Sequence, residues 1–431
     1  MKITQRYTLK NGEIKNTQTD SVTTHGKPDR INIHGIERTG FYGFGAALTE
    51  AAAYTYALMS AENKQKYLDM VFGKEGLNYR ICRICIGSSD FSLDNHVYID
   101  EGDETLSTFS LGIDLDYVIP MARDVLAYRD GDVDFFASPW SPPAFMKDSG
   151  SRIGGHLKPE YYSLYAEYTA RFVEEYAKAG IVIGAVTPQN EPGNGTGWET
   201  CVYTAEEEAR YIRVLRSVFS KHGLSTKILC WDYNRYGMFD RASFIFDNCG
   251  KDADGVAFHW YSKGGCLEDI ALIRELYPDK VIIESEFTNS QKNYFGRYID
   301  EIRNVIAYGT NAVVEWNALL DERGMPCHNR DWGCISPLFY DRQKGTLYKS
   351  VNYNEIYLAS HLIEKGDRIL RTSVSGGCLE CCAVKKPDGS LAVIITNTTD
   401  GDRKALLKAR GEQLELTVPG KSDISVKIER M

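Results

Sequence analysis

The sequence has no apolar run near the roughly 18 residues that span a membrane, although 43% of its 431 residues are hydrophobic. Its first residues, 1–7, have no apolar core behind their charges, unlike a signal peptide. It also lacks a basic surplus, because 50 Lys and Arg face 59 Asp and Glu, a net charge of -9. We therefore expect a globular protein with no membrane insertion and no nucleic-acid partner. We expect it in the cytoplasm, or outside the cell if a leader has been removed.

No regular cysteine framework is evident either. The eleven cysteines are an odd number, and several lie within apolar runs, which predicts buried, reduced thiols in a reducing compartment. Cys82 and Cys85 point to opposite faces of an expected strand, which disfavours a shared metal ion. Cys327 and His328, with Cys334 nearby, have looser metal-like spacing but no second ligand pair. We expect no metal and no cofactor, and the sequence has no glycine-rich phosphate loop with a lysine.

From residue 40 to 320 one unit recurs: a short apolar run, a polar or glycine-bearing loop and a longer helical pattern. The eight runs are residues 40–48, 80–87, 133–140, 181–189, 227–233, 255–261, 280–287 and 311–319. Strands that alternate with helices indicate right-handed βαβ units, and eight of them match a closed barrel better than an open sheet. The sequence therefore predicts an α/β fold with a TIM (β/α)8 barrel over residues 39–345.

Both ends of the chain have a different pattern. Residues 378–384, 391–397, 413–418 and 422–428 are short alternating runs separated by turn sequences. Residues 6–9 and 30–34 look similar. We expect segments 1–38 and 346–431 to contribute strands to one antiparallel β-sandwich side domain beside the barrel.

Two glutamates end predicted barrel strands. Glu191 follows the fourth run within the sequence TPQNEP, and Glu286 ends the seventh. Active sites of TIM barrels are built at the carboxyl ends of the strands, so position selects these two among 59 acidic residues. Two carboxylates that converge on one sugar make a glycosidase. Glu284 lies two residues before Glu286, on the same face of a regular strand, and competes with it for the role.

Seven short motifs follow one another along the barrel. They are 43–50 (GFGAALTE), 89–92 (SDFS), 137–143 (ASPWSPP), 189–192 (QNEP), 259–261 (HWY), 285–286 (SE) and 316–317 (WN). With these motifs, in this order, the chain resembles glycoside hydrolase family 30, which includes lysosomal glucosylceramidases and bacterial β-1,6-glucanases. The resemblance implies a retaining double displacement, with Glu191 as general acid/base and Glu286 as nucleophile.

The resemblance also implies substrate-binding roles for six residues: Asp90, Trp140, Asn190, His259, Tyr261 and Trp316. The asparagine would bind the sugar 2-hydroxyl, the aspartate other hydroxyls, and the tryptophans the apolar face of the ring. The histidine and tyrosine, on one side of their strand, would bind the nucleophile or the sugar. Structural interpretations remain for all of them except Tyr261: a turn asparagine, a loop-capping aspartate, two core tryptophans and a core histidine.

Two further features concern the same end of the barrel. Arg83, on the second strand, is a candidate for orienting Glu286 electrostatically. The loop 321–334 has a Gly-x-Pro outline like that of the family, but its substrate contacts stay unassigned.

We therefore predict a retaining β-glycosidase for β-glucosidic bonds, in β-glucosides, glucosylceramide-like molecules or β-1,6-glucans. The expected partner is a β-linked glycan or glycoside. The alternatives are a β-xylosidase or β-fucosidase of the same fold, a non-catalytic carbohydrate-binding barrel, and a metal-dependent barrel enzyme acting on a sugar.

Overall fold

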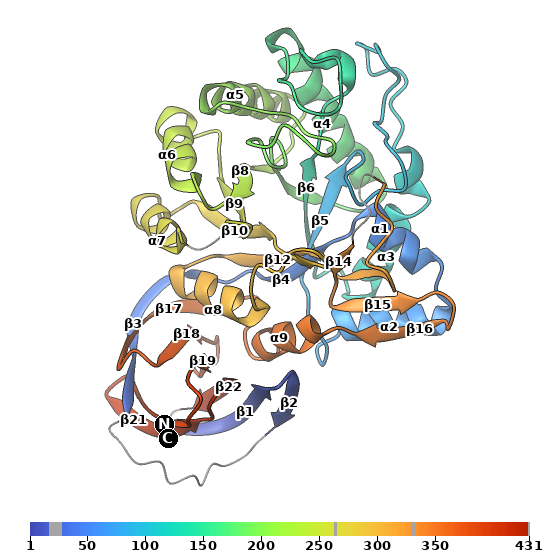
Figure 1. Ribbon diagram of the computed structural model, residues 1–431. Helices are drawn as coiled ribbons and strands as arrows, with labels where there is room; N and C mark the ends of the chain where they lie inside the picture. The colour runs from blue at the N-terminus through green and yellow to red at the C-terminus, as the bar shows by residue number, and fades with distance from the viewer. Residues whose placement is uncertain (17–27, 263–264, 329–332, 430–431) are drawn as a thin grey trace.

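The computed structural model describes residues 1–16, 28–262, 265–328 and 333–429. Figure 1 shows two parts, a ring of strands surrounded by helices and, beside it, a curved sheet at which both ends of the chain lie. None of the helices in the described ranges combines the length and the apolar character that a membrane crossing requires.

Eight parallel strands of the described residues close into a barrel, in the order β10-β12-β4-β5-β6-β7-β8-β9. They are β4 (Gly43–Ala47), β5 (Ile81–Ile86), β6 (Asp134–Pro139), β7 (Ile183–Val186), β8 (Lys227–Asn234), β9 (Gly255–His259), β10 (Val281–Glu286) and β12 (Ala312–Asn317). Each coincides with one of the eight predicted runs, so the predicted TIM barrel is confirmed. The runs are mostly apolar because these strands pack against helices outside and against each other inside.

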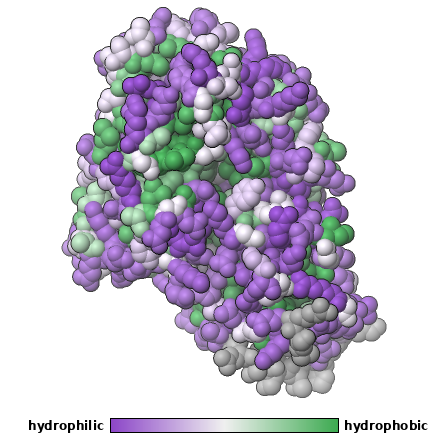
Figure 2. Space-filling model, turned by 180° about the vertical axis from the view of Figure 1, so that it is seen from behind, coloured by the Kyte–Doolittle hydropathy of each residue, from purple (hydrophilic) through white to green (hydrophobic). Residues whose placement is uncertain are grey.

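Apolar side chains fill the barrel interior toward the amino ends of the strands. One buried cluster consists of Ile81, Phe136, Leu229, Ala257, Ile283, Ala312 and Val314. At the amino ends of the strands this interior opens into a largely apolar hollow of about 420 Å³, beside the small residues Gly184 and Ala185 of β7. Figure 2, seen from behind, shows hydrophobic residues gathered in a hollow over the barrel. Polar groups suited to chemistry therefore have to be sought at the carboxyl ends of the strands.

Helices cover the outside of the barrel (Figure 1). They are α1 (Glu50–Ala57), α2 (Ala61–Val71), α3 (Val118–Tyr128), α4 (Tyr162–Lys178), α5 (Ala205–Lys221), α6 (Met238–Cys249), α7 (Leu267–Leu276) and α8 (Tyr298–Tyr308). The tyrosines of α4 are core residues, as its helical spacing predicts: Tyr165, Tyr168 and Tyr176 are buried. A capping box between Thr204 and Glu207 fixes the start of α5.

The side domain is built from both ends of the chain, as predicted. Nine described strands form one sheet in the order β2-β1-β22-β19-β18-β17-β3-β20-β21. They are β1 (Lys2–Lys10), β2 (Glu13–Asn16), β3 (Asp29–Gly40), β17 (Arg368–Ser375), β18 (Leu379–Lys385), β19 (Leu391–Asn397), β20 (Arg403–Ala409), β21 (Glu412–Val418) and β22 (Ser422–Glu429). The sheet is antiparallel except for one pair, since β20 runs parallel to β3. Its own buried cluster includes Ile31, Val393 and Val426.

The chain enters the side domain later than residue 346. Strand β16 (Thr346–Lys349) pairs with β15 (Leu338–Asp341), in a small sheet with β13 (Leu319–Asp321). Helix α9 (Val351–Ser360) follows, and the large sheet begins again only at β17. Because β16 resembles the later strands in composition, the change of sheet is not visible in the sequence.

Candidate active site

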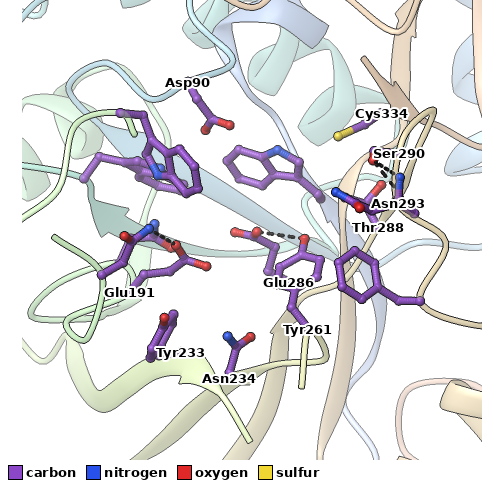
Figure 3. Close-up of a pocket in the computed structure, with 16 residues that line it drawn as sticks. Asp90, Glu191, Tyr233, Asn234, Tyr261, Glu286, Thr288, Ser290, Asn293 and Cys334 are labelled. Atoms are coloured by element: carbon purple, nitrogen blue, oxygen red, sulfur yellow. Dashed lines mark hydrogen bonds between the residues drawn. The ribbon is translucent and has the colours of Figure 1, made fainter. Parts of the chain in front are cut away.

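A pocket of about 350 Å³ lies at the carboxyl ends of the barrel strands, and Figure 3 shows the side chains that line it. Seven of the eight predicted site residues line this pocket: Asp90, Trp140, Asn190, Glu191, Tyr261, Glu286 and Trp316. The eighth, His259, is completely buried next to the two glutamates. The structure therefore brings together residues that are 226 positions apart in sequence, from Asp90 to Trp316.

The two predicted catalytic carboxylates face each other across the pocket. An oxygen of Glu191 and an oxygen of Glu286 lie within 4.8 Å of one another and of a ring nitrogen of His259. Retaining glycosidases hold their two carboxyl groups about 5–5.5 Å apart, whereas inverting enzymes need about 6.5–9.5 Å to admit a water molecule. The spacing fits direct nucleophilic attack.

A break in strand register brings Glu286 into the pocket. The pairing of β10 with β9 shifts between Glu284 and Glu286, so regular alternation ends there. Ile283 belongs to the interior cluster, whereas Glu284 is fully buried on the other side, 3.8 Å from Arg235. The expectation that Glu284 shares a face with Glu286 is wrong, and Glu284 does not line the pocket.

Arg83 and Tyr261 hold the Glu286 carboxylate from two sides. Arg83 donates from Nη1 to Oε2 at 2.5 Å, and the Tyr261 hydroxyl donates to Oε1 at 3.0 Å. Burial alone would lower the pKa of Arg83, but the charges of Asp232 and Glu286 outweigh it and raise that pKa. The expected contact between Arg83 and Glu286 is therefore present. The Arg83 guanidinium also donates to Asn190 Oδ1 at 2.8 Å.

Asp232 on β8 is the central residue beneath the site, and the sequence analysis missed it. It accepts a 2.9 Å bond from Arg83 and bonds of 2.6–2.7 Å from Ser138, Thr187 and Ser285. Burial opposes its ionisation, but Arg83 and the neighbouring imidazole outweigh that effect and hold the pKa of Asp232 far below its ordinary value. The available signal was a lone carboxylate inside the apolar run 227–233, because a buried charge requires partners.

His259 carries a positive charge between three carboxylates. Its Nε2 atom is 3.2 Å from Asp232 Oδ1, and its Nδ1 atom is 3.4 Å from Glu191 and 3.9 Å from Glu286. Burial would lower its pKa, but the charge of Glu286 and the bonds to Asp232 and Glu191 raise the pKa of His259 to about 9.

Protonation of His259 also affects whether the site could bind a metal ion. In the part of the chain that the structure describes, the one group of at least three His, Cys, Asp or Glu residues close enough to share an ion is Glu191, His259 and Glu286. An imidazolium has no lone pair to offer an ion. The trio is better suited to placing charge around a sugar than to binding a metal.

Glu191 has a strained backbone. Its φ angle is +50°, a left-handed conformation that costs a non-glycine residue about 1–3 kcal/mol. Its N–H donates to the carbonyl of Asp232, itself at φ +51°, at 2.9 Å, and Asn194 donates to its carboxylate at 3.0 Å. The two strained turns support each other and place Glu191 opposite Glu286.

Aromatic residues form one wall of the pocket. The rings of Trp140 and Trp316 stack with centroids 5.1 Å apart, and Phe91 packs edge-on against Trp316. Asp90 also lines the pocket, and its carboxylate points into it (Figure 3). This arrangement suits a pyranose, which offers apolar C–H faces and a rim of hydroxyl groups.

Further lining residues come from the end of β8, from two short strands, β11 (Asn289–Ser290) and β14 (Cys334–Ile335), and from loops, and they were not predicted. They are Asn194, Trp198, Tyr233, Asn234, Thr288, Ser290, Asn293, Phe295 and Cys334. No periodic pattern distinguishes these positions from their neighbours, so they could not be selected from residue types alone.

Two family models match the chain. The Glycosyl hydrolase family 30 TIM-barrel domain matches residues 41–363, and the Glycosyl hydrolase family 30 beta sandwich domain matches residues 368–426. The chain belongs to glycosyl hydrolase family 30. The ranges agree with the structure, in which the large sheet begins again at residue 368.

Individual relatives agree with the family assignment. "Putative glucosylceramidase 3" of Caenorhabditis elegans is 30% identical over 92% of this chain and 79% of its own length. "Lysosomal acid glucosylceramidase" of Mus musculus is 28% identical over 84% of this chain and 75% of its own. Among solved structures, "The endo-beta1,6-glucanase BT3312" is 25% identical, covers all of both chains and has a TM-score of 0.87. This member of family 30 is thus a glycoside hydrolase with the features of a retaining β-glycosidase.

Proposed function

We propose that Glu286 is the nucleophile and Glu191 the general acid/base of a retaining β-glucosidic hydrolase. The observation that carries this proposal is the separation of no more than 4.8 Å between oxygens of the two carboxylates. In the first step Glu191 protonates the glycosidic oxygen while Glu286 attacks the anomeric carbon. The C–O bond to the leaving group breaks as the glycosyl ester forms.

In the second step Glu191, now ionised, takes a proton from a water molecule that attacks the anomeric carbon. The ester bond to Glu286 breaks, and the sugar leaves with the configuration that it had in the substrate. Arg83 and Tyr261 hold the carboxylate before attack and receive it again as the leaving group. Because these donors are already in place, little reorganisation is needed during the reaction.

Asn190 and His259 stabilise the sugar and the charges around it. Arg83 binds the Asn190 side-chain oxygen, which leaves its amide N–H groups for a sugar hydroxyl. The imidazolium of His259, 3.4 Å from Glu191, favours the ionised acid/base that the second step requires. Trp140 and Trp316 provide the apolar wall for the ring.

We propose a sugar, rather than a lipid, as the leaving group. The pocket wall beyond the two glutamates presents amide and hydroxyl side chains: Asn194, Asn234, Thr288, Ser290 and Asn293. Such groups can pair with the hydroxyls of a second sugar, whereas an acyl chain offers them no hydrogen-bond partner. Of the activities that its relatives are named for, β-1,6-glucan hydrolysis therefore fits better than glucosylceramide hydrolysis.

Parallel assays of β-1,6-linked glucose oligosaccharides, glucosylceramide and aryl β-glucosides and β-xylosides test this proposal. We expect turnover of the β-1,6-linked substrates, with kcat/KM at least about tenfold above that for glucosylceramide. Preference for the ceramide substrate would contradict the assignment of the leaving group. Preference for xylosides would contradict the assignment of glucose.

Variants of Glu191 test its role separately. Glu191→Ala should lose about 10²–10⁴-fold in kcat for substrates with poor leaving groups, but form glycosyl-enzyme normally from dinitrophenyl β-glucoside, which needs no acid. Azide, which needs no general base, should then restore turnover and give a β-glucosyl azide. A variant that azide does not rescue would assign the acid/base role elsewhere.

For localisation we propose a reducing compartment, in agreement with the cytoplasm expected above. All eleven cysteines lie within the described residues, where none forms a disulfide, and nine of them are buried. Cys82 and Cys85 pack into different core clusters, as expected from their spacing on β5. Titration of the purified native protein with a thiol reagent after unfolding should find eleven thiols per chain.

A further inference from the structure

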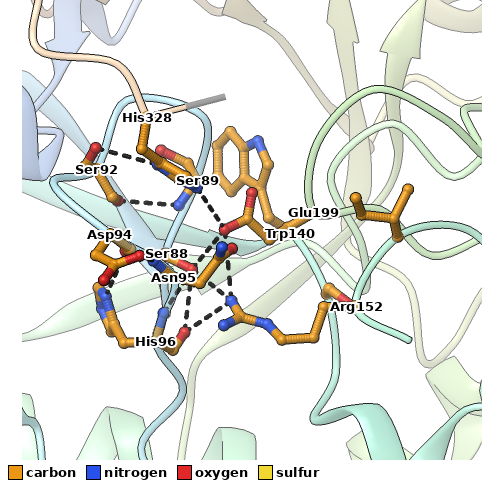
Figure 4. A network of polar contacts seen from close by, with 12 residues as sticks. Ser88, Ser89, Ser92, Asp94, Asn95, His96, Trp140, Arg152, Glu199 and His328 are labelled. Atoms are coloured by element: carbon orange, nitrogen blue, oxygen red, sulfur yellow. Dashed lines mark hydrogen bonds and ion pairs between the residues drawn. The ribbon is translucent and has the colours of Figure 1, made fainter. Parts of the chain in front are cut away.

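His328 lies beside the active-site pocket, in the loop after β13, and its ring joins two other loops (Figure 4). Its Nδ1 atom is 3.1 Å from the backbone carbonyl oxygen of Ser92, and its Nε2 atom is 3.1 Å from Oε1 of Glu199. The side chain of His328 is 9% exposed and that of Glu199 only 1%. The ring therefore bridges two acceptors where water has little access.

The Ser92 carbonyl and the ionised Glu199 carboxylate are both acceptors only. A neutral imidazole carries one N–H, so it would turn the lone pair of its other nitrogen toward an acceptor oxygen. The imidazolium donates to both. Burial works against that charge, but the bond to Glu199 and its negative charge raise the pKa of His328.

Glu199 is suited to hold this cation. It accepts a 2.8 Å bond from the Ser88 hydroxyl and lies 3.6 Å from Arg152. Burial would raise its pKa, but the bonds from His328 and Ser88 lower the pKa of Glu199 to about 2. The carboxylate is therefore ionised throughout the range in which a histidine titrates.

Other titratable groups also lie near the ring, and near neutral pH the histidine among them is uncharged. Asp90 adds negative charge that favours the imidazolium. His96 is neutral there, because burial lowers its pKa to about 4, and it lies 3.6 Å from Glu50, whose pKa burial raises. Asp94 accepts a bond from the N–H of Asn95 at the outer edge of the loop.

The two loops that the ring joins carry walls of the sugar pocket. Ser92 closes a tight turn by accepting a 3.0 Å bond from the N–H of Ser89, and Asp90 projects from this turn into the pocket. Glu199 directly follows Trp198, which lines the pocket as well. His328 thus connects the loop of Asp90 with the loop of Trp198, behind the pocket surface.

We propose that His328 is a positioning residue, whose imidazolium fixes Asp90 and Trp198 by bridging the Ser92 carbonyl and the Glu199 carboxylate. It does not touch the reacting atoms. When the ring loses its proton, one of the two bridges opens, and the binding of the sugar weakens while the two catalytic glutamates stay in place. The inference deepens the proposed function and, for its kinetic part, rests on it.

Steady-state kinetics with a β-1,6-linked glucose disaccharide between pH 5 and 10 measures this effect. KM of the wild type should rise as pH passes through the pKa of the ring, whereas the dependence of kcat on that group should be weak. His328→Gln should raise KM about tenfold at pH 6, the effect of one charged hydrogen bond. The pH-dependent rise in KM seen in the wild type should be absent from the profile of His328→Gln.

His222→Gln is the matched control. His222 also bridges two carboxylates, Glu167 and Glu174, but at the surface and outside the pocket. The control should lose some stability and keep the wild-type KM profile. A His328→Gln variant that kept the wild-type KM profile would overturn the proposal.

A measurement without substrate separates this inference from the proposed function. In NMR spectra of the full-length wild type, the amide of Asp90 and the indole N–H of Trp198 should shift with the titration of the His328 ring. The same signals should not shift in that range in His328→Gln. If the ring titrates and neither signal follows it, His328 does not position these residues, whatever the enzyme hydrolyses.

Discussion

Asp232 joins the charged residues of the site into one unit. Its negative charge balances the positive charges of Arg83 and His259. These two cations in turn face Glu286 and Glu191. In Asp232→Asn the two buried cations lose their shared anion. Removal of one partner from a buried pair typically costs about 3–5 kcal/mol, and urea unfolding should show a loss of that size.

The same variant should also change the histidine. With Asp232 neutral, the pKa of His259 should fall below about 9, and the alkaline limb of the pH profile should move to lower pH with it. Ser285→Ala removes one neutral donor to Asp232 and serves as the control, with an expected cost of about 1 kcal/mol. If Asp232→Asn were no less stable than this control, Asp232 would not hold the site together.

His259 makes stability depend on pH in a defined direction. Its pKa in the folded protein, about 9, lies above the ordinary value of 6.5. The folded state therefore binds the proton more tightly, and the resulting stabilisation is complete below about pH 6.5. It is lost as pH rises toward 9. Relative to His259→Gln, the wild type should lose up to about 3 kcal/mol of unfolding free energy across that window.

At the scale of the element, the interrupted alternation of β10 decides which glutamate reaches the substrate. Glu284 is fully buried, and burial and the nearby charge of Glu301 raise its pKa well above the ordinary value, which favours the neutral acid. Glutamine closely resembles that form. Glu284→Gln should therefore keep kcat within about threefold of the wild type, whereas Glu286→Gln should lose about 10⁴-fold or more. Loss of activity in both variants, with both still folded, would mean that the two residues do not have separate roles.

Helix α5 offers a local test of the fold. The Thr204 hydroxyl accepts a bond from the N–H of Glu207, whose carboxylate accepts one from the N–H of Thr204. Thr204→Ala should cost about 1 kcal/mol in thermal unfolding, whereas Thr204→Ser keeps the hydroxyl and should cost much less. Equal losses would show that packing of the methyl group, and not the cap, matters here.

Elements were easier to predict than the details within them. The barrel strands follow from runs such as 281–283, because only a strand buried on both faces is apolar over its whole length. Glu191 and Glu286 follow from their places at strand ends. The register shift after Glu284 leaves no mark in residue types, and Asp232 was missed because its run was read as uniformly apolar.

At the scale of the whole molecule, the barrel and the side domain are joined by chain and by buried contacts. Strand β3 of the large sheet leads almost directly into β4 of the barrel. Arg303 of α8 is almost completely buried and donates to Thr396 and Glu380 in the side domain. We therefore expect the two parts to unfold in one cooperative transition.

Arg303→Ala tests this coupling. The loss of the buried guanidinium should lower the unfolding free energy by about 3 kcal/mol, while kcat at 25 °C should not change because Arg303 is remote from the pocket. Calorimetry should show one transition in the wild type. Two separate transitions already in the wild type would contradict the expected cooperativity.

Covalent trapping tests the role of Glu286 most directly. A 2-deoxy-2-fluoro-β-glucosyl fluoride slows both steps but keeps an excellent leaving group, so the glycosyl-enzyme accumulates. Mass spectrometry of peptides from the inactivated enzyme should find one added 2-fluoroglucosyl group per chain, attached to Glu286. A label on Glu191, Glu284 or any other residue would contradict this assignment. So would an enzyme that turns over β-glucosides with inversion and takes up no label.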